Sequence, residues 1–358
     1  MTSSALRPDA AVGEIEGRPV TFRYGSVESE YTALRTGALV IDRSHRTRMT
    51  FEGDRRSDTL TGLVTNDVGS LGPGSGLYAA ALTPRGKIIA DVRVFARQGD
   101  LLVDVPVRAA AGWVAMIRKY VNPRATRYVD RTGELSDIAI AGSRARDVVA
   151  RLAGISPDTL ASLSPYSHVA STIGESEVLV ARVPDVGVEA YELIHDQAAR
   201  AALWQGATEL GAAPGGLDAW EIARVEAGRP EWGLDIDEST IPQEANLDDL
   251  HAISYTKGCY TGQETVARVH FRGHVNRHLR GIRYGDGEDV QRVPRGAQLF
   301  DAADKSVGDV RTSVMSPRLG GIALAMVRRE IAPGGSARAR WDGGEAVVGV
   351  VALPFPAA

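Results

Sequence analysis

In the first third of the chain, apolar residues recur with helical spacing in some segments and form strand-like runs in others. Residues 26–39 repeat apolar side chains at helical spacing, and a second helix is expected around 108–120. Between these helices, apolar runs are separated by turn-forming residues at 84–86 and 98–100. The runs predict consecutive strands over 77–82, 88–95 and 101–105.

The pattern changes twice further along the chain. From about 135 to 210, strand-like and helix-like segments alternate, which is typical of a small α+β domain. A helix is then expected from 217, broken by Gly228 and Pro230. From about 277 onward, short apolar segments are separated by Gly, Pro, Asp or Asn, and this spacing predicts a small antiparallel barrel or sandwich.

Composition limits the classes of function. The chain has 358 residues, enough for two or three domains, and its 44% hydrophobic and 24% charged residues are typical of globular proteins. A net charge of −4 does not indicate the positively charged surface that binds nucleic-acid phosphates, so direct nucleic-acid binding is not expected. The N-terminal residues lack the apolar core of a signal peptide, and no stretch has the length of a membrane span. Together with a single cysteine, these features predict a cytoplasmic protein without membrane contact.

The only cysteine, Cys259, lies in the string KGCYTGQE at 257–264. Thr261 and Glu264 match the spacing of a capping box, which predicts that a helix begins here and ends before Gly273. Cys259 would then lie just before a helix N-terminus, with Lys257 nearby, and both features favour the thiolate over the thiol. An inert packing residue is the alternative, because buried cysteines are common.

A basic run follows this string directly. Its histidines are spaced by four residues, but Gly273 breaks the helix that a metal site would need, so no metal is expected. Arginine side chains bind carboxylate and phosphate groups, so the basic run is interpreted either as an anion-binding patch or as a solvated basic face. The residues of the run are Arg268, His270, Arg272, His274, Arg277, His278, Arg280 and Arg283.

Three other charged residues could contact a small molecule. Asp91 lies in the middle of a predicted strand, where a carboxylate is unusual. Arg224 and Glu226 are two positions apart on the helix that begins at 217, so they point to different faces. For each residue taken alone, an ordinary surface charge is the simpler explanation.

The strings now described resemble those of YgfZ-type folate-binding proteins, which are paralogues of the aminomethyltransferase, or T-protein, of the glycine cleavage system. KGCYTGQE carries the resemblance, followed by VAR and FRG, and flanking blocks such as GLVTNDV, EIARVEAGRPEWGLDID and IPQEANLDDL occur in the expected order. The resemblance covers most of the chain.

The resemblance implies an α+β, three-domain ring of the T-protein type. A first domain of residues 1–130 plus about 215–275 would bind folate and be discontinuous. A ferredoxin-like second domain would cover 131–214, and a C-terminal antiparallel β-barrel would cover 276–358.

The resemblance also implies a cofactor, partners and a site. The cofactor would be tetrahydrofolate or a derivative, bound in the central hole, and the partners would be folate and iron–sulfur client proteins. The role would be maturation or repair of iron–sulfur proteins, linked to tRNA modification. Cys259, Lys257 and Asp91 would carry the chemistry, with Cys259 as a reactive thiol. The folate-contacting residues would be Tyr78, Asn66, Arg224, Glu226, Tyr260, Gly262, Gln263 and Glu264.

Departures from the T-protein pattern favour the YgfZ-type branch. The T-protein acidic pair in GGxxDD is reduced here to Asp91, and the motif GYTGEDGFE reads DVGVEAYE, with its glutamate absent or displaced to Glu189. T-proteins also lack the cysteine. Whether the chain is an enzyme is therefore left open, and two alternatives remain. One is a folate-dependent aminomethyltransferase or other one-carbon transferase, and the other is a non-catalytic folate-sensing scaffold.

Overall fold

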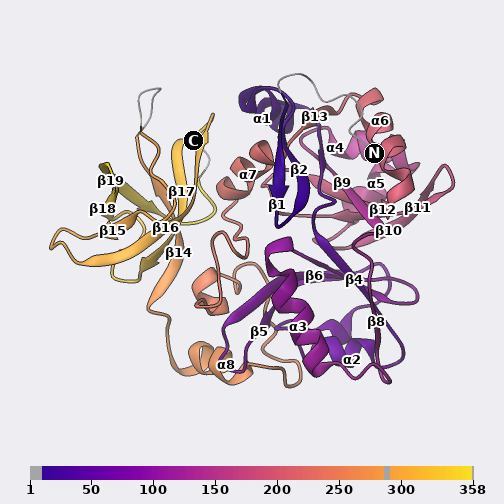
Figure 1. Cartoon of the computed structure of the whole chain (residues 1–358), viewed down its shortest axis with the longest axis horizontal. Helices are drawn as coiled ribbons and strands as arrows, with labels where there is room; N and C mark the ends of the chain where they lie inside the picture. Colours follow the sequence, from indigo (N-terminus) through magenta and orange to yellow (C-terminus); the bar gives the residue numbers. More distant parts are fainter. Residues whose placement is uncertain (1–9, 286–290, 357–358) are drawn as a thin grey trace.

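A computed structural model describes residues 10–285 and 291–356 and arranges them in two open sheets, a two-stranded hairpin and a closed barrel (Figure 1). The hairpin, β1 (Ala11–Ile15) with β2 (Arg18–Arg23), was not predicted from the sequence. Pro19 and the charged residues Glu14, Arg18 and Arg23 weaken the strand signal of these two segments.

The five-stranded sheet is antiparallel throughout and confirms the three strands predicted between 77 and 105. Its apolar face packs against helix α2 (Arg56–Thr61) and helix α3 (Ala110–Tyr120), which continues the 3₁₀ turn η2 (Val107–Ala109). A second 3₁₀ turn, η1 (Val68–Ser70), follows α2. The strand order is β5 (Gly76–Leu82), β6 (Ile88–Ala96), β7 (Leu101–Val105), β4 (Thr47–Glu52) and β8 (Arg127–Asp130).

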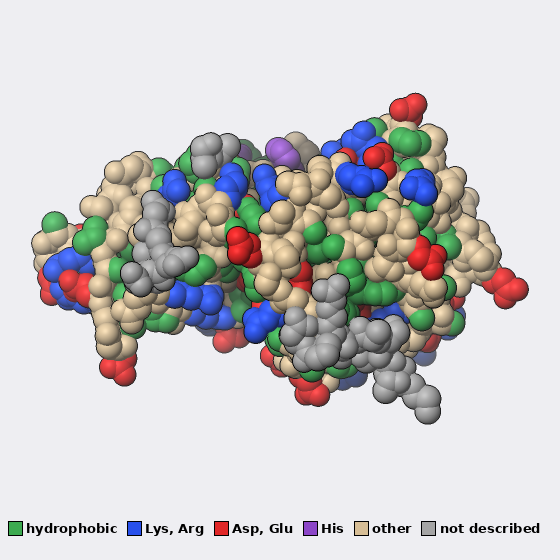
Figure 2. Space-filling model, turned by 90° about the horizontal axis from the view of Figure 1, so that it is seen from above, with side chains coloured by type: hydrophobic (Ala, Val, Ile, Leu, Met, Phe, Trp, Pro, Cys, Tyr) green, Lys and Arg blue, Asp and Glu red, His purple; other side chains and the backbone are tan. Residues whose placement is uncertain are grey.

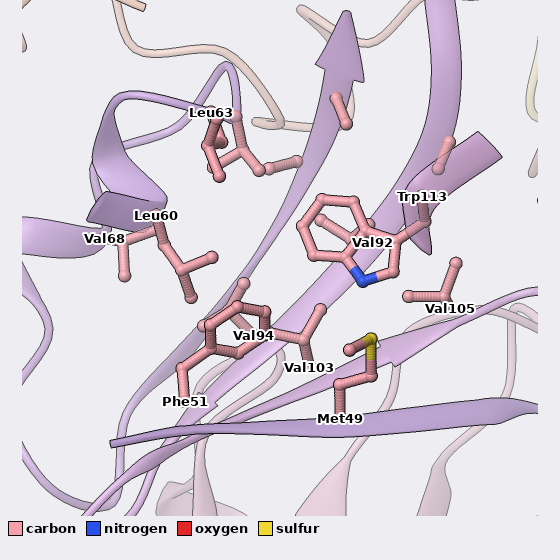
Figure 3. Close-up of a cluster of buried hydrophobic side chains, with 14 of the residues drawn as sticks. Met49, Phe51, Leu60, Leu63, Val68, Val92, Val94, Val103, Val105 and Trp113 are labelled. Carbon is pink, nitrogen blue, oxygen red and sulfur yellow. The ribbon is translucent and has the colours of Figure 1, made fainter. Parts of the chain in front are cut away.

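The core on this face is closely packed around one tryptophan. Trp113 is fully buried, and its ring meets Phe51 edge-on with 6.3 Å between ring centroids (Figure 3). Val92 and Val94 reach the same core from β6, two residues apart, because side chains on a strand alternate between faces. Arg93, which lies between them, therefore points to the opposite face of the sheet.

The six-stranded sheet combines strands from three distant parts of the chain. Helices α4 (Ala145–Ala153), α5 (Pro157–Ser162) and α6 (Arg200–Glu209) cover one face, with η3 (Gln197–Ala199) leading into α6. Helices α1 (Val27–Thr36) and α7 (Leu217–Glu226) cover the other face. The strand order is β10 (His168–Ile173), β11 (Ser176–Arg182), β12 (Ala190–Asp196), β9 (Leu135–Ala141), β3 (Leu39–Asp42) and β13 (Ala213–Gly215).

Strands β3 and β13 bear on the predicted domain boundaries. Both belong to segments that we assigned to the first domain or to its border with the second, yet β3 pairs with β9 and β13 pairs in parallel with β3. The proposed division at 131 and 214 therefore stays a prediction, since hydrogen bonds of one sheet cross both positions.

The C-terminal region is a closed barrel of six strands, and this confirms the expected fold class. It lies on one side of the molecule in Figure 1 and contacts α1 and α7 through Leu279, Val314 and Phe355. Pairing of the first strand with the last closes the barrel. The order is β14 (Arg277–Arg283), β17 (Gly320–Arg328), β16 (Ser306–Ser316), β15 (Gln298–Phe300), β18 (Ser336–Trp341) and β19 (Gly344–Val351).

The segment between α7 and the barrel contains η4 (Pro242–Ala245) and α8 (Gln263–Arg272). Among the described helices, none combines the length and the apolar composition that a bilayer crossing requires. On the face shown in Figure 2, basic and acidic side chains are interspersed rather than gathered by sign.

Candidate functional site

A narrow cavity lies where the two open sheets meet α7 and the residues that follow it. Its volume is about 30 Å³, which is room for about one water molecule. It is lined mainly by polar and aromatic side chains from strands β5 and β6 of the five-stranded sheet, from α7 and from four loops. The lining residues are Arg43, Arg46, Tyr78, Asp91, Arg93, Tyr166, Asp185, Trp220, Arg224, Arg229, Pro230 and Glu231.

Asp91 faces this cavity because of the two-residue period of strand β6. Ala90 and Val92 point into the core around Trp113, so Asp91 points away from it. The Tyr78 hydroxyl donates a hydrogen bond to Asp91 Oδ2 at 3.1 Å, and buried Asp91 Oδ1 has no hydrogen-bond partner among the described residues. Burial raises the pKa of Asp91 to about 6, with Arg46 opposing the rise. Asp91 therefore changes charge close to neutral pH.

Two tyrosines form an aromatic wall beside Asp91. The rings of Tyr78 and Tyr166 are stacked with centroids 5.9 Å apart, and the Tyr166 hydroxyl donates to Asp185 at 3.2 Å. Tyr166 has φ = 64°, a left-handed conformation that is strained for an aromatic residue. A strained backbone persists only where surrounding contacts stabilise it. Here the stacking on Tyr78 and the hydrogen bond to Asp185 do so. Tyr166 was not predicted from the sequence, because none of the neighbouring residues indicates a left-handed backbone at this position.

Arginines and carboxylates surround the cavity in a buried network. Arg93 binds Asp185, and its other terminal nitrogen lies 2.6 Å from Glu192. Arg43 lies 3.3 Å from Glu192 and stacks over the Trp220 ring at 4.1 Å. The carboxylates raise the pKa of Arg93 against the opposing effect of burial, so this guanidinium stays charged.

Asp104 is the centre of this network. It is fully buried on β7 and lies 2.6 Å from Arg46, 3.3 Å from Arg48 and 3.7 Å from Arg93. Strand register causes this convergence, because Asp104 is directly opposite Arg48 on β4 and Arg93 on β6. Burial alone would raise the pKa of Asp104, but the three arginines outweigh burial and lower it. Arg48 also binds Asp137 at 2.9 Å. Burial and the nearby charge of Glu192 raise the pKa of Asp137.

A signal in the sequence could have revealed part of this network. Charged residues stand at every second position inside strands that are otherwise apolar, as in the strings IIADVRVFA and LLVDV. On a sheet with one face in the core, this pattern normally marks a solvated face. Here the six-stranded sheet and α7 cover the second face, so the charges must pair with one another.

Arg224 lines the cavity and joins three parts of the molecule. Its guanidinium lies 2.6 Å from Asp235 and 2.6 Å from Glu221, and donates to the Thr312 hydroxyl of the barrel at 3.3 Å. Nearby carboxylates, Asp235 first, raise the pKa of Arg224 against the effect of burial. Arg224 is thus held between α7, the segment after α7, and strand β16.

Asn66 and Glu226 do not line the cavity. Asn66 donates to the backbone oxygens of Tyr78 at 2.9 Å and His251 at 2.8 Å, so it fixes the strand that carries Tyr78. Glu226 accepts from the Tyr31 hydroxyl at 2.8 Å and from Arg318 at 2.9 Å, which ties α1 and α7 to the barrel. Their assignment as folate contacts stays a prediction.

The 257–264 string forms a surface turn rather than a wall of the cavity. Cys259 is exposed, and none of the eight residues lines the cavity. Lys257 donates to the backbone oxygen of Thr61, and its ammonium lies 4.3 Å from the centre of the Tyr260 ring. Burial lowers the pKa of Lys257 to about 8. Tyr260 itself is buried against the core that contains Tyr78.

The predicted capping box between Thr261 and Glu264 is wrong. Helix α8 begins at Gln263 with Gly262 as its N-cap, and no side chain caps it. Gln263 folds back to accept from the Tyr260 backbone N–H at 3.2 Å, and Glu264 points to solvent. Gly262 has φ = 82°, and a Cβ there would lie 2.6 Å from the Thr83 backbone oxygen. Close packing on the β5–β6 turn therefore requires this glycine.

Two other predicted contacts fall elsewhere. Glu189 is held outside the cavity by Arg146 at 2.8 Å, whereas Glu192, three residues on, lies in the buried network. Within the basic run, Arg277 pairs with Glu244 at 3.0 Å, and Arg268 and Arg272 are exposed on α8. Among residues 10–285 and 291–356, no cluster of three His, Cys, Asp or Glu is placed to hold a metal.

Comparisons with known proteins define the family. The GCVT N-terminal domain matches residues 7–254, and the glycine cleavage T-protein C-terminal barrel domain matches residues 277–356. An aminomethyltransferase of Alcanivorax borkumensis is 31% identical over 314 residues, covering 86% of this chain and 83% of that protein. One of Saccharopolyspora erythraea is 29% identical over 357 residues, covering 97% of this chain and 94% of that protein.

A solved structure shares the fold. The glycine cleavage system aminomethyltransferase T from Bartonella henselae superposes with a TM-score of 0.85 at 21% identity, covering 97% of this chain and 94% of that chain.

The resemblance to YgfZ-type proteins is corrected by these matches, since the relatives are named aminomethyltransferases and both domains are those of the T-protein. The string that carried the resemblance, 257–264, falls between the two matched segments, so neither domain match includes it. The chain belongs to the family defined by the GCVT N-terminal domain and the glycine cleavage T-protein C-terminal barrel domain.

Proposed function

We propose that this chain is a folate-dependent aminomethyltransferase that works at the buried cavity around Asp91. The observation that carries the proposal is a carboxylate with a pKa of about 6 and one oxygen without a partner among the described residues, in a cavity between the two open sheets. Buried acids with such values are suited to proton transfer at neutral pH. The names of the relatives supply the reaction class, which the cavity alone does not.

The residues of the cavity fit a tetrahydrofolate, or a derivative, in chemical type. The Tyr78–Tyr166 wall offers flat aromatic surface to a pteridine ring. Asp91 Oδ1 and Arg229 Nη1 are buried polar atoms that lack hydrogen-bond partners among the described residues, so both could serve a polar heterocycle. When bound, tetrahydrofolate would supply the nitrogens that accept a one-carbon unit.

The size of the cavity sets a condition on binding. About 30 Å³ is far smaller than a pteridine, so side chains must move before a ligand enters. Arg229 is the least restrained of the lining arginines, because it is only partly buried and its side chain makes one hydrogen bond within the described chain, to Pro184 O at 3.4 Å. We expect Arg229 to move first, while Arg93 and Arg224 stay fixed by short ion pairs.

The roles of the chain's own residues follow from their positions. Asp91 as the carboxylate would accept a proton or stabilise positive charge on the reacting carbon and nitrogen. Tyr78 holds Asp91 in place through its hydroxyl. Arg224 contacts Asp235 and Thr312, and these contacts hold α7 and the barrel together beside the cavity.

The test combines ligand binding with turnover. Tetrahydrofolate binding is measured by calorimetry, and methylenetetrahydrofolate formation is followed with an aminomethyl donor. We expect Asp91→Asn to bind tetrahydrofolate but to lose about 10²–10⁴-fold in turnover. Cys259→Ser, on the exposed turn, should retain turnover. Full activity of Asp91→Asn would contradict the proposal, and binding without turnover in the wild type would instead support a non-catalytic folate-binding scaffold.

A further inference from the structure

Helix α8 has one face that no other part of the described chain covers. Glu264, Arg268, Phe271 and Arg272 are all exposed and are spaced i, i+4, i+7 and i+8, so they share that face. The opposite side is anchored, since Val266 is fully buried and its backbone oxygen accepts from Gln243 at 2.9 Å. In Figure 1 the helix lies at the lower edge of the molecule. We call these four residues the outer face of α8.

Phe271 is held in an exposed position by other aromatic rings. Its side chain is 67% exposed, yet it meets His270 edge-on at 4.7 Å and Tyr255 at 6.1 Å between ring centroids. His270 stacks on Tyr255 at 3.6 Å, and the Tyr255 hydroxyl binds Asp248. Phe271 is therefore presented by a fixed aromatic support. A large exposed side chain that loses little freedom on binding is typical of an interface anchor.

The charges beside Phe271 are unbalanced. Arg268 and Arg272 take part in no ion pair within residues 10–285 and 291–356, although most buried arginines of this chain do. Glu264 is the only acidic residue on the outer face. The whole chain has a net charge of −4, so this face opposes the overall charge. An acidic partner surface would be complementary in charge to the outer face of α8.

We propose that the outer face of α8 is a docking surface for an acidic protein segment that carries apolar or aromatic side chains. Phe271 would bury its ring against the apolar side chains of the partner, and Arg268 and Arg272 would pair with its carboxylates on either side. A nucleic-acid strand is a poorer match, because the chain has net negative charge and the face offers one ring rather than a row of them. The surface is separate from the buried cavity and does not depend on the proposed reaction.

The test uses a defined acidic probe. Binding of the random copolymer poly(Glu,Tyr) to the full chain is compared with binding of poly-glutamate and of oligo(dT). We expect poly(Glu,Tyr) to bind at least tenfold more tightly than poly-glutamate. Phe271→Ala should weaken that binding about tenfold or more, and Arg268→Glu with Arg272→Glu should abolish it.

The matched control reverses the same two charges elsewhere. Arg118 and Arg151 are exposed on α3 and α4, and the double variant Arg118→Glu with Arg151→Glu should bind poly(Glu,Tyr) as the wild type does. Circular dichroism checks that each variant is folded.

Several results would overturn the proposal. Equal binding of poly-glutamate, or no effect of Phe271→Ala, would show that charge alone acts. Equal losses in both double variants would show that net charge rather than this face decides. Stronger binding of oligo(dT), or no binding of poly(Glu,Tyr), would also contradict it. Dimerisation of the protein that Phe271→Ala abolishes would mean that a second copy covers the face.

Discussion

The molecule contains two groups of arginines with opposite surroundings. Arg43, Arg46, Arg48, Arg93 and Arg224 are buried and each lies against at least one carboxylate. The arginines of α8 are exposed and pair with no acid of the described chain. The two exposed arginines lie within five residues of each other in the sequence, whereas the buried group is gathered by folding from three segments, at 43–48, 93 and 224. Proximity along the chain is thus a poor guide to which charges act together.

The first and largest effect should come from removing the acid at the centre of the buried group. Asp104→Ala leaves three buried arginines without a shared partner and should lower the free energy of unfolding by about 3–5 kcal/mol. Urea unfolding measures this loss. Glu134→Ala, which removes an exposed acid paired with Arg131, is the control and should unfold within error of the wild type. Equal effects of the two substitutions would remove the distinction between the groups.

The second prediction concerns the one cavity carboxylate whose pKa is raised to about 6. The neutral form of Asp91 is favoured by folding, so its contribution to stability is present below pH 4 and is lost as the pH rises through 6. Asp91→Asn stays neutral, and relative to the wild type it should gain up to about 3 kcal/mol between pH 4 and pH 8. Unfolding at several pH values tests this, and a difference that does not change with pH would show that Asp91 titrates normally.

The third prediction addresses the turn that leads into α8. Gly262→Ala should destabilise the protein by roughly 1–3 kcal/mol, because φ is 82° and the new Cβ would meet the Thr83 oxygen. Gly258→Ala, four residues earlier in an open position, should have little effect. If both substitutions are tolerated equally in thermal unfolding, the turn does not pack as tightly as the structure shows.

The smallest effect should come from the exposed arginines. Replacing Arg268 and Arg272 together by Ala should change the free energy of unfolding by no more than about 0.5 kcal/mol, since neither makes an ion pair within the described chain. A loss comparable with that of Asp104→Ala would show that these arginines support the fold.

The strands and the barrel could be predicted because each has a local signature. Alternation and turn residues marked β5, β6 and β7, and regular short segments marked the barrel. The hairpin β1–β2 had no such signature. The wrong capping box shows the limit of local rules, because Thr261 and Glu264 have the required spacing but tertiary packing places Gly262 at the cap.

Part of the lining of the cavity could be predicted for the same reason. Asp91 could be found because a carboxylate in the middle of a strand is unusual, and Tyr78 and Arg224 came from the family resemblance. Tyr166, Asp185 and the loop arginines could not be found, because each looks like an ordinary polar residue until the two sheets face each other. The resemblance identified the fold correctly but chose the wrong branch of the family, because it gave weight to KGCYTGQE and to departures from two T-protein motifs, whereas the matches over the rest of the chain are to aminomethyltransferases.

The position of β3 in the six-stranded sheet affects how the protein is made. Roughly 170 residues separate β3 from its parallel neighbour β13, and at about 5–20 residues per second the ribosome needs roughly 10–35 s to supply them. During that interval β3 has at least one unoccupied edge, and two until β9 has been made, which makes the nascent chain open to pairing with other strands. Slow synthesis of residues 43–212 would lengthen this interval, so translation speed in that segment is expected to influence the yield of soluble protein.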